Sequence, residues 1–155
     1  MSKIYYLCSL MFLMLVFATQ SHAQVSSQTP TLEAKRWKDT QLVEPSVLAN
    51  KLKANTSHAI IFNMGPMEDI KGAKRIGPGK DAENIEKLKK EVASLPKNTE
   101  LIIYCGCCPL QTRCPNAKPA FDVLIKLGFT NVKVLNLATN LKTNWIDKGY
   151  PIQEK

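Results

Sequence analysis

The chain is 155 residues long, a length that suggests one domain, and 21 basic against 13 acidic side chains give it a formal net charge of +8. The lysines are spread over several segments, and no basic run is interleaved with aromatic residues, which argues against a nucleic-acid-binding protein. We interpret the excess charge as a solubility feature that can also attract small anions.

The first 23 residues have the layout of a secretory signal peptide. A basic start at Lys3 precedes an apolar run over residues 4–17, and Ser21 and Ala23 suit positions −3 and −1 of a cleavage site. The apolar run is shorter than the roughly 20 residues that span a bilayer. The sequence therefore predicts an exported protein, periplasmic or secreted, that is not an integral membrane protein after cleavage.

Residues 24–40 are expected to be a leader, because they begin with a polar, apolar-poor stretch, and residues 41–153 are expected to form the domain. The domain opens with a predicted short edge strand at residues 42–43. A helix follows over residues 45–55, with proline at an early turn where its missing N–H is harmless. The continuous apolar run at residues 59–62 predicts a strand that is buried on both faces.

The middle of the domain repeats this alternation of strands and helices. A second short strand is predicted near residues 74–76, and Asp81 is placed to cap a helix that extends to residue 95. Residues 101–104 are apolar and predict another buried strand, which leads directly into Cys105.

After a cysteine-rich loop, the pattern predicts a helix over residues 116–127, a strand over 132–137 and a last helix over 140–148. Trp37 and Trp145 are expected to pack in the core. Strands that alternate with helices predict an α/β fold with a mostly parallel central sheet of about four or five strands and helices on both faces.

The cysteines are the most informative feature of the sequence. Cys8 lies in the predicted signal peptide, and the other four, Cys105, Cys107, Cys108 and Cys114, lie within one short loop. Disulfides that stabilise a fold usually join distant segments, because closing a long loop removes the most unfolded-state entropy. This spacing therefore favours reactivity, metal binding or a local redox change.

Cys105 follows a buried strand and precedes a helix, the place where ligands collect in doubly wound sheets. Main-chain N–H groups and the helix dipole at such a junction favour negative charge, so we expect a lowered pKa and a nucleophilic thiolate. We expect Gly106 and Arg113 to bind the anionic part of a substrate. Asn63 ends a strand on the same edge and is a candidate for the rim of the site.

Several segments together resemble the rhodanese domain, over roughly residues 42–152. They are the strand that runs into Tyr104-Cys105, Leu127-Gly128-Phe129, V-K-V-L-N-L at 132–137, W-I-D-K-G-Y-P at 145–151 and I-K-G-A at 70–73. The resemblance implies a sulfurtransferase in which Cys105 accepts sulfane sulfur as a persulfide and passes it to a thiophilic acceptor. It implies no cofactor, and a small sulfur-containing anion or a thiol as partner.

The chain departs from the family pattern in and around the loop. The loop at residues 105–116 is longer than usual and carries three additional cysteines. Asn63 stands where an aspartate is common, and Ala138-Thr139 replaces a usual glycine pair.

Four interpretations of the loop stay open. In the first, one of Cys107, Cys108 and Cys114 resolves a persulfide on Cys105. In the second, Cys105 and Cys108 form a C-x-x-C dithiol for disulfide exchange. In the third, all four thiolates bind a soft metal such as Zn²⁺ or Cu⁺. In the fourth, the domain is a non-catalytic rhodanese-like binding module whose loop is closed by disulfides.

Overall fold

The computed structural model describes residues 36–154. The predicted signal peptide at residues 1–23 and most of the predicted leader lie outside the described residues. Within the part that is described, no helix has the length and apolar character needed to cross a membrane.

Five parallel strands form one sheet in the order β1-β5-β4-β2-β3. The strands are β1 (Leu42–Val43), β2 (Ile60–Asn63), β3 (Lys74–Arg75), β4 (Leu101–Tyr104) and β5 (Val132–Leu135). In the centre of the sheet Phe62 of β2 pairs with Ile103 of β4, which pairs in turn with Val134 of β5. The short strands β1 and β3 lie at the two edges, as predicted for residues 42–43.

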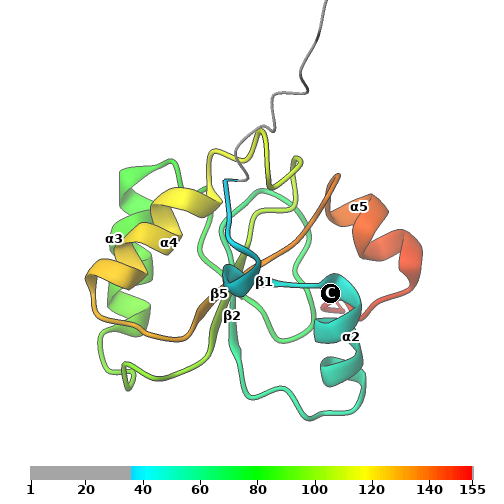
Figure 1. Cartoon of the computed structure of the whole chain (residues 1–155), viewed down its shortest axis with the longest axis horizontal. Helices are drawn as coiled ribbons and strands as arrows, with labels where there is room; N and C mark the ends of the chain where they lie inside the picture. The colour runs from blue at the N-terminus through cyan, green and yellow to red at the C-terminus, as the bar shows by residue number, and fades with distance from the viewer. Residues whose placement is uncertain (1–35, 155) are drawn as a thin grey trace, which may run out of the picture. The chain divides into compact units, whose positions relative to one another are not determined.

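Helices cover both faces of this sheet. They are α2 (Pro45–Lys53), α3 (Ala82–Val92), α4 (Ala117–Lys126) and α5 (Leu141–Asn144), with 3₁₀ turns η1 (Asp39–Gln41) and η2 (Ile146–Lys148). Figure 1 shows α3 and α4 on one side of the strands and α2 and α5 on the other. The predicted α/β fold, with a parallel sheet and helices on both faces, is confirmed.

Consecutive residues of the central strands supply both halves of the core. Phe62 and Ile103 pack with α3 and α4, whereas their neighbours Ile61 and Ile102 pack with α2 and α5. Successive side chains of a strand point to opposite faces, so a strand covered on both sides must be apolar throughout. This is why residues 101–104 form an unbroken buried run.

Both tryptophans lie in the core, as predicted. Trp37 is buried and meets Phe121 of α4 edge to face at 5.1 Å, although it belongs to the stretch expected to be a leader. Trp145 is fully buried against Tyr150, and its indole N–H donates a hydrogen bond to the carbonyl of Pro151.

Two local predictions were wrong. The single helix expected over residues 140–148 is interrupted at Trp145, whose φ of −131° and ψ of −61° are not helical, because its indole is fixed by the Pro151 carbonyl. Asp81 precedes α3, but its side chain caps no helix N–H and pairs with the Lys80 ammonium at 3.1 Å.

Candidate active site

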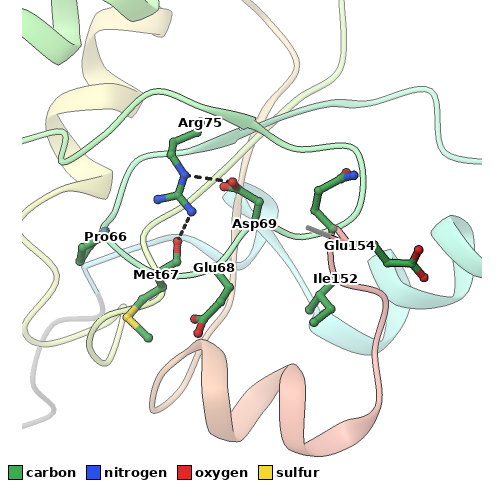
Figure 2. Close-up of a pocket in the computed structure, with 8 residues that line it drawn as sticks. Pro66, Met67, Glu68, Asp69, Arg75, Ile152 and Glu154 are labelled. Carbon is green, nitrogen blue, oxygen red and sulfur yellow. Dashed lines mark hydrogen bonds and ion pairs between the residues drawn. The ribbon is translucent and has the colours of Figure 1, made fainter.

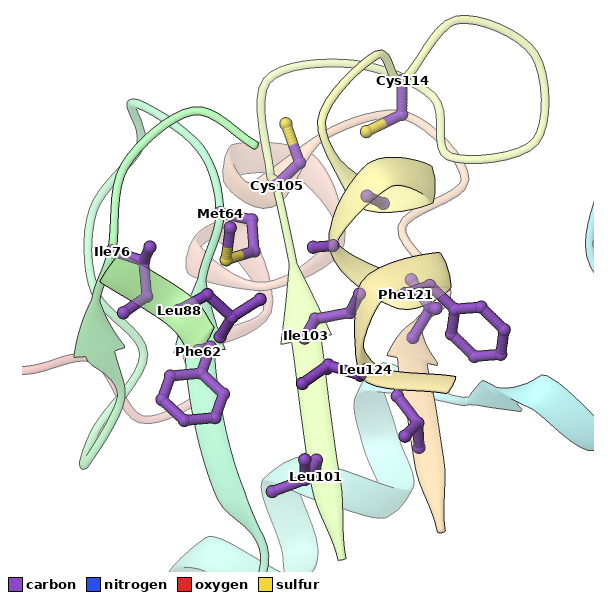
Figure 3. Packing of buried hydrophobic residues seen from close by; sticks show 14 of the residues in the cluster. Phe62, Met64, Ile76, Leu88, Leu101, Ile103, Cys105, Cys114, Phe121 and Leu124 are labelled. Atoms are coloured by element: carbon purple, nitrogen blue, oxygen red, sulfur yellow. The ribbon is translucent and has the colours of Figure 1, made fainter. Parts of the chain in front are cut away.

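The cysteine loop, residues 105–116, joins the carboxyl end of β4 to the start of α4. Figure 3 shows Cys105 at the end of β4 and Cys114 above the first turn of α4. Cys105 and Cys114 are each 2% exposed, Cys108 is partly buried, and Cys107 is exposed. All four are free thiols.

The four sulfurs are neighbours in the order Cys108, Cys107, Cys105 and Cys114, and the exposed Cys107 lies between the partly buried Cys108 and the buried Cys105. The Sγ of Cys107 lies 3.1 Å from the Sγ of Cys108 and 3.1 Å from the Sγ of Cys105. The Cys114 thiol forms a hydrogen bond with Cys105 as well. Cys105 therefore has one thiol neighbour toward solvent and one toward α4.

Asn116 completes the surroundings of the Cys105 sulfur. Its side-chain amide is 3% exposed and donates from Nδ2 to the Cys105 Sγ at 3.1 Å. Its Oδ1 accepts a hydrogen bond from the main-chain N–H of Lys80, also at 3.1 Å. Because the oxygen is held by an N–H donor, the NH₂ group must face the sulfur.

These contacts favour the thiolate form of Cys105. Hydrogen bonds from the Cys114 thiol, from Asn116 and from the main-chain N–H and thiol of Cys107 lower the pKa of Cys105 from an ordinary 9.0 to about 5, against the effect of burial. The pKa of Cys114 is raised, chiefly because its thiol donates to Cys105. The pKa of Cys107 is raised by burial and by its thiol neighbours. These shifts favour a thiolate at Cys105 and protonated thiols at Cys107 and Cys114.

The donors differ from those expected from the sequence. We expected an accessible thiolate held by several main-chain amides. Among the described residues only one main-chain amide, that of Cys107, lowers the pKa of Cys105, and the other hydrogen-bond donors are side chains. Gly106 turns the loop with a φ of +79° and is buried between Met67 and Leu141, and its carbonyl accepts the Leu141 N–H at 2.8 Å. The loop folds over Cys105 and leaves it 2% exposed.

The two residues predicted to bind an anion lie at different depths. Gly106 is buried, whereas Arg113 is exposed, and the carbonyl of Arg113 accepts a hydrogen bond from the Cys108 thiol at 3.6 Å. Anion binding by either residue stays a prediction.

A different arginine, which the sequence analysis missed, holds the loop. The Arg36 guanidinium donates to the carbonyls of Cys114, at 2.9 Å, and Thr112, at 3.3 Å. Arg36 is 78 positions from Cys114 in the chain, so no local pattern points to this contact.

Asn63 acts on the site through another residue. It is fully buried, its Oδ1 accepts the Gly65 N–H at 2.9 Å, and its Nδ2 donates to the Met67 carbonyl and to Asp69 Oδ1, each at 2.8 Å. Gly65 in turn packs on the main chain of Cys105, where a Cβ would lie 1.9 Å from the Cys105 carbonyl oxygen. The side chain of Asn63 therefore shapes the turn against the site.

A hollow of about 780 Å³ borders this turn on its other side. Its lining residues, most of which Figure 2 labels, are Pro66, Met67, Glu68, Asp69, Arg75, Ile152, Gln153 and Glu154. Arg75 pairs with Asp69 at 2.9 Å and also donates to the Met67 carbonyl. No cysteine is among the lining residues, so the hollow adjoins the cysteine loop through Met67 without containing the thiols.

Comparison with known proteins finds likeness in structure alone. No protein-family model matches the chain, and no curated protein matches its sequence. The rhodanese-like domain of an Anabaena sp. protein, solved by NMR, is 21% identical with a TM-score of 0.53, over 74% of this chain and 80% of that one. The crystal structure of a Bacillus halodurans protein is 20% identical with a TM-score of 0.55, over 74% of this chain and 77% of that one. The crystal structure of a Lactobacillus plantarum protein is 16% identical with a TM-score of 0.55, over 74% of this chain and 89% of that one.

At these identities the matches establish the fold and no activity. The five-stranded parallel sheet and the helices on both of its faces are consistent with that fold. The resemblance drawn from the sequence is confirmed in this respect: the chain has the rhodanese-like α/β fold.

Proposed function

We propose that the protein is an exported sulfurtransferase in which Cys105 accepts sulfur from a small anionic donor and Cys107 releases it. The observation that supports this most is the set of hydrogen bonds that Cys105 receives from Cys114, Asn116 and Cys107. A thiolate is the nucleophilic form of cysteine, and these donors favour it at neutral pH.

The first step is attack on a sulfane sulfur, with thiosulfate as the simplest donor. The Cys105 thiolate forms a bond to the outer sulfur, the S–S bond of thiosulfate breaks, and its electron pair leaves with sulfite. The product is a persulfide anion on Cys105. The donors that favour the thiolate, Cys114 and Asn116, also favour this anion.

The second step uses the neighbouring thiol. The Cys107 sulfur, 3.1 Å from the Cys105 Sγ, attacks that atom and forms a Cys105–Cys107 disulfide. The outer sulfur leaves as hydrosulfide and keeps the proton given up by Cys107. An external thiol reductant then supplies two electrons and one proton, which restores the Cys105 thiolate and the Cys107 thiol.

The burial of Cys105 limits the size of the donor. Cys105 is 2% exposed, whereas its contact Cys107 is exposed, so the donor reaches the thiolate from the side of Cys107. This arrangement favours an inorganic anion or a slender persulfide over a bulky substrate.

Thiol–disulfide exchange without sulfur transfer is the second candidate. The sulfur–sulfur contacts favour Cys105 with Cys107 as the redox pair, because Cys107 lies between Cys105 and Cys108. The C-x-x-C pair Cys105 and Cys108 is expected to react more slowly than Cys105 and Cys107.

Sulfur transfer and thiol–disulfide exchange can be distinguished by adding thiosulfate to reduced, metal-free protein and measuring the sulfide released and the persulfide formed. The wild type should release sulfide, the Cys107→Ser variant should accumulate the persulfide and release little sulfide, and Cys105→Ser should do neither. Sulfide release by Cys105→Ser at the wild-type rate would refute the proposal. Disulfide formation in redox buffers, without any uptake of sulfur from thiosulfate, would favour the second candidate.

A further inference from the structure

Three of the four cysteine sulfurs converge on one point. The Sγ atoms of Cys105, Cys107 and Cys108 all lie within 4.8 Å of one another, with two of the separations at 3.1 Å. Cys114 contacts Cys105 but does not belong to this group. No histidine or carboxylate joins the three sulfurs among residues 36–154.

From this convergence we infer that Cys105, Cys107 and Cys108 form a three-thiolate site for Cu⁺. The sequence suggested all four cysteines as ligands of a soft metal, and the structure brings three of them together. This inference does not depend on the proposed sulfur transfer, because it uses the positions of the sulfurs and not their reaction with a donor.

The geometry suits a single ion in the plane of three sulfurs. Metal–thiolate bonds of about 2.3 Å place three sulfurs in a trigonal plane about 4 Å apart. Two of the observed separations, 3.1 Å each, are about 1 Å shorter than that value, and the third is at most 4.8 Å. The two short contacts are sulfur–sulfur hydrogen bonds, and they are expected to lengthen when the ion replaces the protons that they share.

The type and number of ligands favour Cu⁺ over Zn²⁺. Thiolates are soft ligands, which Cu⁺ prefers, and three of them satisfy its coordination. A structural Zn²⁺ site is almost always closed by four protein ligands. Cys114 is not among the sulfurs that lie within 4.8 Å of one another, so the group supplies three ligands and not four.

The surroundings of the three sulfurs fit such a site. Asn116 donates an amide N–H to the Cys105 sulfur at 3.1 Å, which is the outer-shell contact that orients a thiolate ligand. Cys107 is exposed, so an ion can be received there and passed inward. Binding to one thiolate and two thiols releases two protons and leaves a net charge of −2 on the cluster, in a chain of net charge +8.

Copper and sulfur would compete for the same atom. An ion held by Cys105 occupies the electron pair with which the thiolate attacks a sulfur donor. One equivalent of Cu⁺ should therefore abolish sulfur uptake by the protein, and removal of the ion with a strong chelator should restore it.

The test is a titration of reduced, oxygen-free protein with Cu⁺ buffered by the chromophoric chelator bathocuproine disulfonate, followed by X-ray absorption at the copper edge. We expect one Cu⁺ per chain with three sulfur neighbours. Cys105→Ser, Cys107→Ser and Cys108→Ser should each weaken binding more than about tenfold, since loss of even an outer-shell partner costs about 10- to 100-fold. The matched control Cys114→Ser should keep one copper and three sulfurs.

Any one of several results would overturn the site. They are failure to take Cu⁺ from the chelator, two sulfur neighbours in place of three, and a loss in Cys114→Ser as large as in the other variants. Stoichiometric Zn²⁺ binding without Cu⁺ binding would do the same. Sulfur uptake in metal-free buffer is measured separately, so the copper site and the proposed transferase can each fail without the other.

Discussion

The side-chain amide of Asn116 faces the thiolate of Cys105, with Nδ2 to Sγ at 3.1 Å, while its oxygen is held by the main-chain N–H of Lys80. The amide is 3% exposed at the N-cap position of α4, so solvent has little access to either hydrogen bond. Asn116 therefore links the segment before α3 to the reactive sulfur. It also fixes the direction of one hydrogen bond that this sulfur accepts.

Replacing this amide should raise the pKa of Cys105. A hydrogen bond to a charged group is worth about 1.5–3 kcal/mol, so Asn116→Ala should raise the pKa by roughly one to two units. Asn116→Asp keeps the acceptor for Lys80 but sets a carboxylate beside the sulfur, and it should raise the pKa further. The ultraviolet absorbance of the thiolate, followed against pH, measures both. An unchanged titration in both variants would show that the amide does not act on the sulfur.

Stability should depend on pH through Cys105. Its pKa falls from 9.0 to about 5 on folding, so between these values the unfolded chain binds the proton and the folded protein does not. The contribution of Cys105 to the free energy of unfolding must then rise with pH across this window and be lost as pH falls through about 5. Cys107 and Cys114 have raised pKa values, so their contributions are lost at pH above the ordinary value.

Urea unfolding of the wild type and of Cys105→Ser, between about pH 5 and pH 9, measures this dependence. The difference between the two proteins should grow with pH in favour of the wild type. Equal pH slopes for the two would mean that Cys105 titrates normally in the folded protein.

Replacing Asn63 with aspartate, the residue common at this position in the rhodanese domain, should destabilise the protein. Its Nδ2 faces the Met67 carbonyl and the Asp69 carboxylate, so Asn63→Asp would set a second carboxylate against both oxygens. We expect a loss of about 1–3 kcal/mol in the free energy of unfolding. Adding Asp69→Asn should recover much of it, because the surface ion pair of Asp69 with Arg75 is worth under about 1 kcal/mol. A double variant as unstable as Asn63→Asp would refute this explanation.

Gly65 should be the most sensitive glycine near the site. A Cβ at Gly65 would lie 1.9 Å from the Cys105 carbonyl oxygen, and a main-chain atom cannot rotate away. Gly65→Ala should cost about 1–3 kcal/mol or more and displace the cysteine loop. Gly72 is the matched control: it has a φ of +77° and no atom within 4 Å of an added Cβ, so Gly72→Ala should cost about 1 kcal/mol. Denaturant unfolding of the two variants measures both losses in the free energy of unfolding. Equal losses would contradict the close contact between Gly65 and the Cys105 carbonyl oxygen.

Much of the fold was predictable because its signals are local. The apolar runs that became β2 and β4 are continuous since both faces of the sheet are covered, and Cys105 follows β4 directly in the chain. The last helix was predicted too long because its break at Trp145 depends on a hydrogen bond to Pro151, six positions later, which helical periodicity does not report.

The chemical environment of Cys105 was predicted in part. Its position and its lowered pKa follow from the strand-to-helix junction, but the donors do not. The contact of Arg36 with Cys114 joins residues 78 positions apart, and the burial of Cys105 arises from the path of the whole loop. Asn116 was visible in the sequence only as the start of a helix, and its use as a donor to sulfur depends on how α4 packs beside β4.

The most direct test of Cys105 as the sulfur acceptor is to locate the sulfur by peptide mass. Trypsin cleaves after Lys97 and Arg113, so Cys105, Cys107 and Cys108 lie in one fragment, 98–113, and Cys114 in the next. Reduced, metal-free Cys107→Ser protein, in which the persulfide is not resolved, should gain one sulfur atom from thiosulfate, and tandem fragmentation should place it on Cys105. A sulfur atom found on Cys108 or Cys114, or an undiminished gain when Cys105→Ser is added to this variant, would contradict the account.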